Sequence, residues 1–461
     1  MYIYVDVSKS YVQFDPTSRP VITGFLAKNG CIDHSLVADC AVHELSALAL
    51  DKDGLFWTND GLLSQLHYQQ TFPRLKCKRT SSSSSSTPDV DGPNSSWTHS
   101  SRASAIVNME HSSLAKKFTC PKAWLYLFPS IVSTAAGLRF LSRTPDGSVQ
   151  LIQTQLQATT PLVPERIFVI LRTCKKIDDS TWVVADVSVD SSLNVGYPCG
   201  CLIQGTADGL SQVTWVEHLE FKQSYLDPKL YNDLCSRGFA FGADRWVACL
   251  ERSCERRSFH QTKAYFFNPN LAEEDPWEWE KRCVMRFSKR MVHHFCLNII
   301  SFGWKNPQSL CVSAPPQSKV LLKVNFSRYH NDPTELVILA TATFSLPHSP
   351  DFVLKILGDE RRRHELDASG RIGPLTEVAC YTTGGDPRNK ISVQANQSFG
   401  NELLLQEVSV SRSGSLVVWS LVTPSEPSFD LAKLGQSPKK WWFICHTGST
   451  AGGSSHKGIM A

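Results

Sequence analysis

The run WVVADVSV at residues 182–189 lies in the stretch from Ile131 to Arg256 that decides the fold. In six segments of this stretch, apolar residues alternate with polar ones or form short apolar runs, as expected of β-strands. The segments are 131–142, 149–156, 163–174, 182–189, 202–204 and 213–221. Turn sequences separate them, and Pro145-Asp146-Gly147 and Asp178-Asp179-Ser180 are the clearest. The sequence therefore predicts a series of consecutive β-strands.

One long amphipathic helix is predicted after the last strand. Asp227-Pro228 provides a helix cap and a first-turn proline. Apolar residues then recur at spacings of three and four residues, namely Phe239, Ala243, Trp246, Leu250 and Cys254. Because such a stripe must be buried, we expect one face of this helix to lie across the sheet.

Four motifs in this stretch resemble the START domain of plant class IV homeodomain-leucine zipper transcription factors. The motifs are WVVADVSVD at 182–190, YPCGCLIQ at 197–204, TWVEH at 214–218 and FGADRWVA at 241–248. The resemblance implies an α+β helix-grip fold, in which a curved antiparallel sheet surrounds a cavity and the last helix forms its lid. It also implies a lipid or sterol ligand, a role in transcription regulation and a nuclear location, with the cytoplasm as the alternative.

Composition restricts the class of protein. The chain has 461 residues, 42% of them hydrophobic, which suffices for two or three globular domains. A formal net charge of +4 is too small to predict a nucleic-acid surface over the whole molecule. We find no secretory signal and no apolar run of membrane-spanning length, so we expect an intracellular, soluble protein. The 15 cysteines then predict buried thiols rather than disulfides.

The first predicted domain, a START domain, spans residues 39–257, with a boundary near Asp39 where a short helical stripe begins. Residues 1–38 stay unassigned, because they show short β-like runs and no periodic helix of useful length. They contain neither a basic recognition helix nor a heptad repeat. We therefore expect the chain to lack the DNA-binding half of the resembled family and to bind no specific duplex DNA by itself. Within the domain, residues 76–103 include the serine run Ser81 to Ser86 and are predicted to be a disordered loop.

The second predicted domain spans residues 258–430 and resembles the START-adjacent domain of the same family. A helix is expected from Asp275-Pro276, and its apolar positions include Val284, Phe287, Met291 and Phe295. Five basic residues share this helix, namely Lys281, Arg282, Arg286, Lys289 and Arg290. They fit a nuclear-import or phosphate-binding surface, or an ordinary solvated face. Strands, a helix and further strands follow, and residues 431–461 are expected to be a flexible tail.

An enzyme is not predicted. The sequence contains no nucleophile elbow, no phosphate-binding glycine loop and no His-Glu-x-x-His motif. Cys199 with Cys201, and His293 with His294 and Cys296, are metal-ligand residue types, but they lack the paired spacing of a zinc site. We therefore expect no metal and no cofactor other than the lipid or sterol.

The predicted ligand site lies between the sheet and the long helix. One face of the strand 213–221 carries Trp215 and Glu217, so a carboxylate lies in an apolar row. Because a buried charge needs a partner or serves a ligand, Arg166 and Arg172 are candidate partners of Glu217. A structural ion pair or an exposed face is the alternative. The predicted ligand-binding residues are Arg166, Trp215, Glu217, Phe239 and Trp246.

The leading hypothesis is a lipid-binding regulatory module, with homeodomain-leucine zipper proteins as candidate partners. A cytosolic lipid carrier is one rival. The other is a protein-interaction module whose cavity is filled by side chains.

Overall fold

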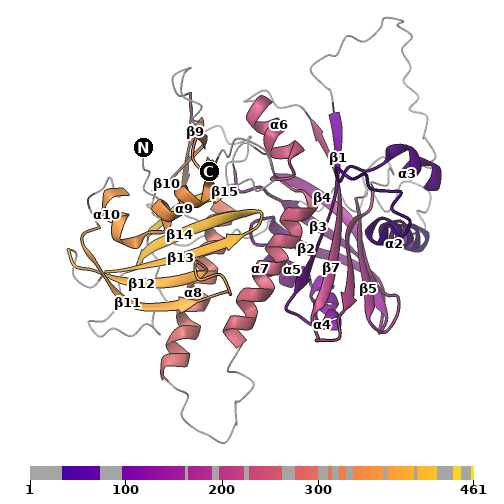
Figure 1. Cartoon of the computed structure of the whole chain (residues 1–461), viewed down its shortest axis with the longest axis horizontal. Coiled ribbons are helices and arrows are strands. Elements are labelled where there is room, and N and C mark those ends of the chain that lie inside the picture. Colours follow the sequence, from indigo (N-terminus) through magenta and orange to yellow (C-terminus); the bar gives the residue numbers. More distant parts are fainter. Residues whose placement is uncertain are drawn as a thin grey trace, which may run out of the picture.

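Two antiparallel sheets, with two long helices between them, form the molecule (Figure 1). The helices are α7 (Ala243–Gln261) and α8 (Pro276–Asn298). The computed structural model describes residues 34–72, 96–160, 163, 165–188, 197–222, 228–261, 276–298, 310–313, 321–328, 336–366, 370, 372–398, 402–422, 440–447 and 458–460. Residues 1–33, which belong to the segment left unassigned from the sequence, lie outside the described residues.

The first sheet has the strand order β1-β7-β6-β5-β4-β3-β2, and all neighbouring strands are antiparallel. Its strands are β1 (Ser96–Val107), β2 (Val132–Thr144), β3 (Gly147–Leu156), β4 (Arg166–Lys176), β5 (Thr181–Ser188), β6 (Cys199–Gly205) and β7 (Ser211–Lys222). The six strands predicted between Ile131 and Phe221 are confirmed, with ends that shift by a few residues. With α7 packed across β1 and β7, the predicted helix-grip fold is confirmed as well.

The predicted single helix after β7 is wrong, because the chain forms two helices there. α6 (Pro228–Ser236) ends before Gly238, whose φ of +73° is a left-handed conformation that favours glycine. A Cβ atom on Gly242 would lie 2.6 Å from the Gly238 Cα atom, so the turn between α6 and α7 needs both glycines. The predicted apolar stripe is confirmed from Ala243 to Cys254, whereas Phe239 lies in the turn and is half-buried.

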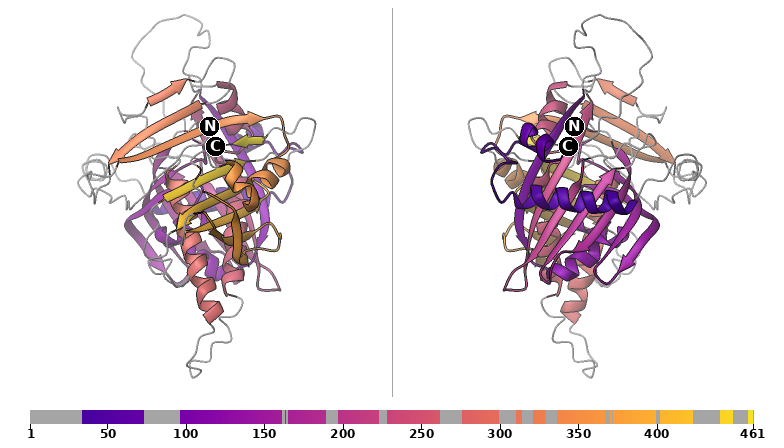
Figure 2. Two further views of the ribbon diagram at one scale, coloured as in Figure 1. Left: turned by 90° about the vertical axis from the view of Figure 1, so that its left-hand side faces the viewer. Right: turned by 90° about the vertical axis from the view of Figure 1, so that its right-hand side faces the viewer.

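Helices cover both faces of the first sheet. α4 (His111–Phe118) and α5 (Pro121–Leu127) share the inner face with α7, and α3 (Gln65–Thr71) follows α2. α2 (His34–Leu50) crosses the outer face of the sheet (Figure 2). Its Leu45 and Leu48 are fully buried against a cluster that includes Val183 and Leu202. The predicted stripe is thus confirmed, and the helix begins before the expected boundary at Asp39.

The predicted disordered loop at 76–103 is wrong over residues 96–103. These residues belong to β1, which pairs along its whole length with β7. Few β1 side chains are buried, so the apolar signal of this strand is weak, and backbone hydrogen bonds to β7 hold it in place. Residues 76–95 of the predicted loop lie outside the described residues.

The second sheet has the strand order β11-β12-β13-β14-β15-β16-β10-β9-β8. Its strands are β8 (Leu310–Ser313), β9 (Leu321–Arg328), β10 (Leu336–Leu346), β11 (Leu375–Thr382), β12 (Lys390–Asn396), β13 (Leu403–Ser411), β14 (Gly414–Val422), β15 (Lys440–Thr447) and β16 (Gly458–Met460). α9 (Pro350–Gly358), a 3-10 turn (Glu360–Arg362) and α10 (Arg363–Leu366) lie between β10 and β11. α8 packs against this sheet through Val284, Phe287, Met291 and Phe295, which confirms the predicted stripe.

The predicted flexible tail at 431–461 is wrong for two segments. β15 extends the second sheet by pairing with β14, and β16 pairs with β15 and β10. The run WWFI at 441–444 consists of aromatic and β-branched residues, which favour strands. The flexible tail was predicted because glycine and serine residues are frequent around this run.

The outer face of α7 joins the two domains. Arg256 forms a bidentate ion pair with Glu407 on β13, with nitrogen–oxygen distances of 2.9 and 3.0 Å. Arg252 donates hydrogen bonds to the carbonyl and hydroxyl oxygens of Thr383 and to the Ser409 hydroxyl. Glu407 is 3% exposed and also accepts from the Ser288 hydroxyl on α8. α7 is therefore part of the first core on one face and of the domain interface on the other.

Candidate functional site

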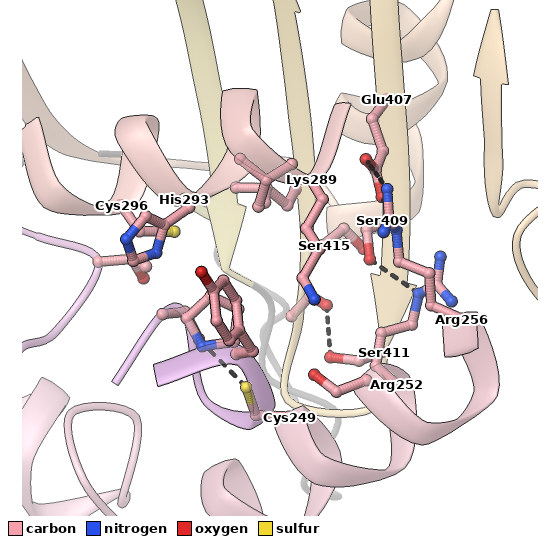
Figure 3. A pocket seen from close by; sticks show the side chains of 18 of the residues that line it. Cys249, Arg252, Arg256, Lys289, His293, Cys296, Glu407, Ser409, Ser411 and Ser415 are labelled. Atoms are coloured by element: carbon pink, nitrogen blue, oxygen red, sulfur yellow. Dashed lines mark hydrogen bonds and ion pairs between the residues drawn. The ribbon is translucent and has the colours of Figure 1, made fainter. Parts of the chain in front are cut away.

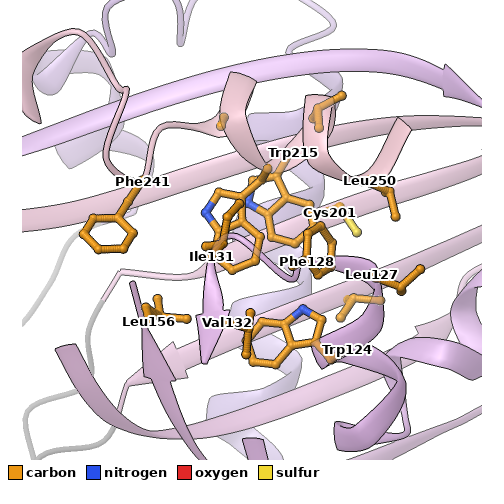
Figure 4. Close-up of a cluster of buried hydrophobic side chains, with 14 of the residues drawn as sticks. Trp124, Leu127, Phe128, Ile131, Val132, Leu156, Cys201, Trp215, Phe241 and Leu250 are labelled. Carbon is orange, nitrogen blue, oxygen red and sulfur yellow. The ribbon is translucent and has the colours of Figure 1, made fainter. Parts of the chain in front are cut away.

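A stack of three indole rings occupies the space between α7 and the first sheet (Figure 4). The Trp246 ring of α7 lies between Trp215 of β7, at a centroid distance of 4.7 Å, and Trp124 of α5, at 5.8 Å. Phe128 meets Trp215 and Trp246 with its ring tilted by 65° and 70°. Each indole is 2% exposed, so a ligand can enter this core only if the rings separate.

Local structure fixes the position of each ring. Pro121 starts α5 and directs Trp124 inward, and the alternation along β7 places Trp215 on the inner face. The Ala243 backbone N–H donates to the Ser101 hydroxyl of β1 at 3.0 Å, which anchors the start of α7 one turn before Trp246. Arg245 donates to the carbonyl oxygens of Phe239, Ala240 and Ser130, so the turn before α7 is also held in place.

Glu217 is buried beside this stack. The Trp215 indole N–H donates to the Glu217 Oε2 atom at 2.8 Å, and the side chain is 4% exposed. Burial raises the pKa of Glu217 to about 8, although hydrogen bonds from Trp215 and Cys199 oppose this rise. Below that pH the carboxyl group is neutral and carries a proton that can be donated. The prediction of a carboxyl group within an apolar row is thus confirmed.

Arg166 and Arg172 are not the ion-pair partners of Glu217 that the sequence predicted. Arg172 instead forms a bidentate pair with Asp186 of β5, with distances of 2.7 and 2.6 Å, and its guanidinium group lies 3.9 Å from the Trp124 ring centroid. The Arg166 guanidinium group lies over the Phe241 ring at 5.5 Å. Strand register explains the pairing, because Arg172 is directly opposite Asp186. Within the described part of the chain, Glu217 forms no ion pair.

Two indole N–H groups of the stack have no hydrogen-bond partner among the described residues. They are the Nε1 atoms of Trp124 and Trp246, and both are fully buried. Buried tryptophan N–H groups normally find an acceptor, and an unsatisfied buried donor costs about 1–3 kcal/mol. The Nε1 atom of Trp182 likewise has no partner among the described residues, so what distinguishes the pair of Trp124 and Trp246 is that both donors belong to one stack.

The structure brings three of the five predicted site residues together, namely Trp215, Glu217 and Trp246. Arg166 lies near Phe241 at the start of β4, and Phe239 lies at the edge of the core. Whether these residues bind a ligand stays a prediction. The prediction missed Trp124 and Phe128, although the run WLYLFP at 124–129 offered a signal through its closely spaced aromatic residues.

In the described ranges, no group of three or more His, Cys, Asp or Glu side chains is arranged to hold a metal ion. Burial raises the pKa of both the Cys199 and the Cys201 thiols. No helix in this part of the chain is long and apolar enough to cross a membrane.

Two family models match separate parts of the chain. Residues 83–256 match the START domain, and residues 278–438 match the PDF2-like C-terminal domain. Homeobox-leucine zipper protein HDG11 of Arabidopsis thaliana is 32% identical over 437 residues, which are 91% of this chain and 56% of the relative. Homeobox-leucine zipper protein HDG12 of the same plant is 32% identical over 451 residues, which are 92% of this chain and 63% of the relative.

The chain is similar to homeobox-leucine zipper proteins over about nine tenths of its own length. It carries the START domain and the PDF2-like domain, and it covers less than two thirds of the length of the two relatives. A structural match to human StAR-related lipid transfer protein 5 covers 34% of this chain and 76% of that chain, with 17% identity and a TM-score of 0.26. The assignment of the START fold rests on the family match and on the strand order.

Proposed function

We propose that the START domain binds a lipid or sterol between α7 and the sheet and that the chain acts as a regulatory module. The supporting observation is the pair of buried, unpartnered indole N–H groups of Trp124 and Trp246. A ligand oxygen that accepts from one of them would satisfy a donor for which the described residues offer no acceptor. The homeobox-leucine zipper names of the relatives suggest proteins of that class as partners, and co-purification tests this part.

The chemistry of the core favours an uncharged, largely apolar ligand. Its walls are apolar, and at neutral pH Glu217 offers a protonated carboxyl group rather than a charge. An ion would lose its hydration without a counter-charge beside the stack, because Arg172 is already paired with Asp186. A hydroxyl or ester oxygen can accept from an indole N–H group or from Glu217 without this penalty.

A protein-interaction module is the second candidate function. It is favoured by the close stacking of Trp215 on Trp246, because these rings fill the space that a ligand would occupy. On this alternative, α7 and the sheet form a permanently packed core. The same experiment separates the two functions.

Native mass spectrometry of the purified full chain is expected to show a bound lipid mass in the wild type. Trp246→Phe and Trp124→Phe each keep an aromatic ring and remove an N–H donor, so each is expected to retain lipid about two- to tenfold less well. Glu217→Gln nearly preserves the shape of the side chain and is expected to change which lipids are retained.

Trp419→Phe is the matched control, because Trp419 lies in a core cluster of the second domain. This variant is expected to retain lipid as the wild type does. A wild-type chain without any lipid mass would support the packed interaction module instead. Equal lipid loss in all three tryptophan variants would show that destabilisation, and not a lost donor, is responsible.

A further inference from the structure

A cavity of about 420 Å³ lies between the outer face of α7 and the second domain (Figure 3). α8 and the turn between β13 and β14 form its other walls. None of Trp124, Trp215, Trp246 and Glu217 lines it, so it is separate from the core of the START domain. Its volume is within the range of about 300–1,000 Å³ that small-molecule sites occupy.

The described residues that line this cavity carry more positive than negative charge. Among the described residues that line it, Glu407 is the one carboxylate. This carboxylate already pairs with Arg256 and accepts a hydrogen bond from Ser288. Lys289, Arg257 and Arg286 also line the cavity, and no carboxylate in the described ranges forms an ion pair with them. Basic residues of α7 and α8 therefore line one space with more cations than carboxylates.

Lys289 is one of these cations, and like Arg257 and Arg286 it lines the cavity with a side chain that is exposed to solvent. Its ammonium group lies 4.3 Å from the Tyr126 ring centroid. Burial lowers the pKa of Lys289 to about 8, and repulsion from Arg256, Arg257 and Lys117 lowers it further in the same direction. An anion beside Lys289 would relieve this repulsion.

The remaining walls carry apolar side chains together with several serine and threonine hydroxyl groups. The apolar side chains are those of Met285 and Val292 of α8, Phe239 of the turn before α7, Tyr126 and Leu416. His293 adds a buried Nδ1 atom that has no partner in the described part of the chain, and burial lowers the pKa of its ring to about 4, so the ring is neutral. The cavity thus combines several cations, neutral hydrogen-bonding groups and apolar side chains.

We propose that this cavity binds an anionic amphiphile, with its carboxylate or phosphate beside Lys289 and its alkyl chain along the wall formed by Met285, Val292 and Phe239. Such a ligand touches α7 of the START domain and α8 and β13–β14 of the PDF2-like domain at once. It therefore stabilises the interface that Arg252 and Arg256 form. This site does not depend on lipid binding in the core of the START domain.

Calorimetric titration of the full chain with decanoate, and with decanol as the uncharged counterpart, tests the proposal. We expect the wild type to bind decanoate at least about tenfold more tightly than decanol, because the carboxylate accepts a charge-assisted hydrogen bond. Lys289→Gln is expected to weaken decanoate binding about tenfold and to leave decanol binding unchanged, which also shows that the cavity is intact. Lys289→Arg keeps the charge and is expected to keep most of the affinity.

Arg290→Gln is the matched control, because it removes one charge from the same helix and Arg290 does not line the cavity. Its effect on decanoate is expected to be less than about twofold. Equal affinity for decanoate and decanol, or an equal loss in Arg290→Gln and Lys289→Gln, would overturn the proposal. If inorganic phosphate binds as tightly as decyl phosphate, the site takes a free anion and the role of the alkyl chain is wrong.

Lipid binding in the core and anion binding in the cavity can be tested independently of each other. Trp246→Phe is expected to change lipid retention in the core without changing the affinity for decanoate. Conversely, Lys289→Gln is expected to leave the lipid mass of the purified chain unchanged. Decanoate affinity that falls in Trp246→Phe but not in Lys289→Gln would place the anion in the core and contradict the second site.

Discussion

Between pH 5 and pH 8, the ionisation of Glu217 is expected to lower the free energy of unfolding by about 3 kcal/mol. The folded state raises the pKa of this buried carboxyl group from 4.5 to about 8. Between these two values the folded state holds the proton and the unfolded chain releases it. The contribution of Glu217 to the free energy of unfolding is therefore complete below pH 4.5, and it decreases as the pH rises toward 8.

Urea unfolding of the wild type and of Glu217→Gln across this pH range measures the effect. The glutamine variant cannot ionise at this position, so the difference in stability between the two proteins is expected to grow with pH in favour of the variant. A difference that does not change with pH would show that Glu217 is already ionised in the folded protein. Other titrating groups affect both proteins alike and cancel in the comparison.

Asp186→Ala is expected to destabilise the START domain by about 3–5 kcal/mol. Arg172 is 1% exposed at its side chain, and Asp186 supplies its carboxylate partner through two hydrogen bonds. Without Asp186, an uncompensated guanidinium group stays in the core under Trp124. Removing one partner of a buried ion pair lowers the free energy of unfolding strongly, because the other charge stays buried without a partner.

The double variant Arg172→Met, Asp186→Leu separates this cause from a general packing defect. Replacing both charges with apolar side chains is expected to recover most of the stability, because no charge stays buried. Asp39→Asn is the exposed control, since Asp39 pairs with Lys175 at the surface of the same domain, and its expected effect is within about 1 kcal/mol. Thermal unfolding of the wild type, Asp186→Ala, the double variant and Asp39→Asn measures these differences in stability. A double variant no more stable than Asp186→Ala would contradict the explanation by an uncompensated charge.

Much of the fold could be predicted from local sequence patterns. Strands β2–β7 carry apolar alternation and clear turn residues, and the buried stripes of α7 and α8 follow helical spacing. These signals are local, so one chain suffices to find them. β1 and β15 were missed because serine-rich or glycine-rich surroundings hide strands whose backbone pairing is decided by β7 and β14.

The candidate site was less accessible to sequence reasoning. Glu217 stood out because a carboxylate interrupts an apolar row, but the pairing of Arg172 depends on the register between β4 and β5. Sequence patterns also gave no sign that Arg252 and Arg256 would contact residues of β13, since these contacts join positions far apart along the chain. Contacts of this kind follow from packing rather than from periodicity.

α7 covers the first core with one face and contacts the second domain with the other. A coding sequence that is divided at the end of this helix therefore separates residues that contact each other in the full chain. A fragment ending at Gln261 would keep every strand of the first sheet. It would also leave Arg252 and Arg256 without Thr383, Ser409 and Glu407, which hold them in the full chain. The two domains are thus expected to be inherited and expressed as a pair, and recombination between them should leave two damaged halves.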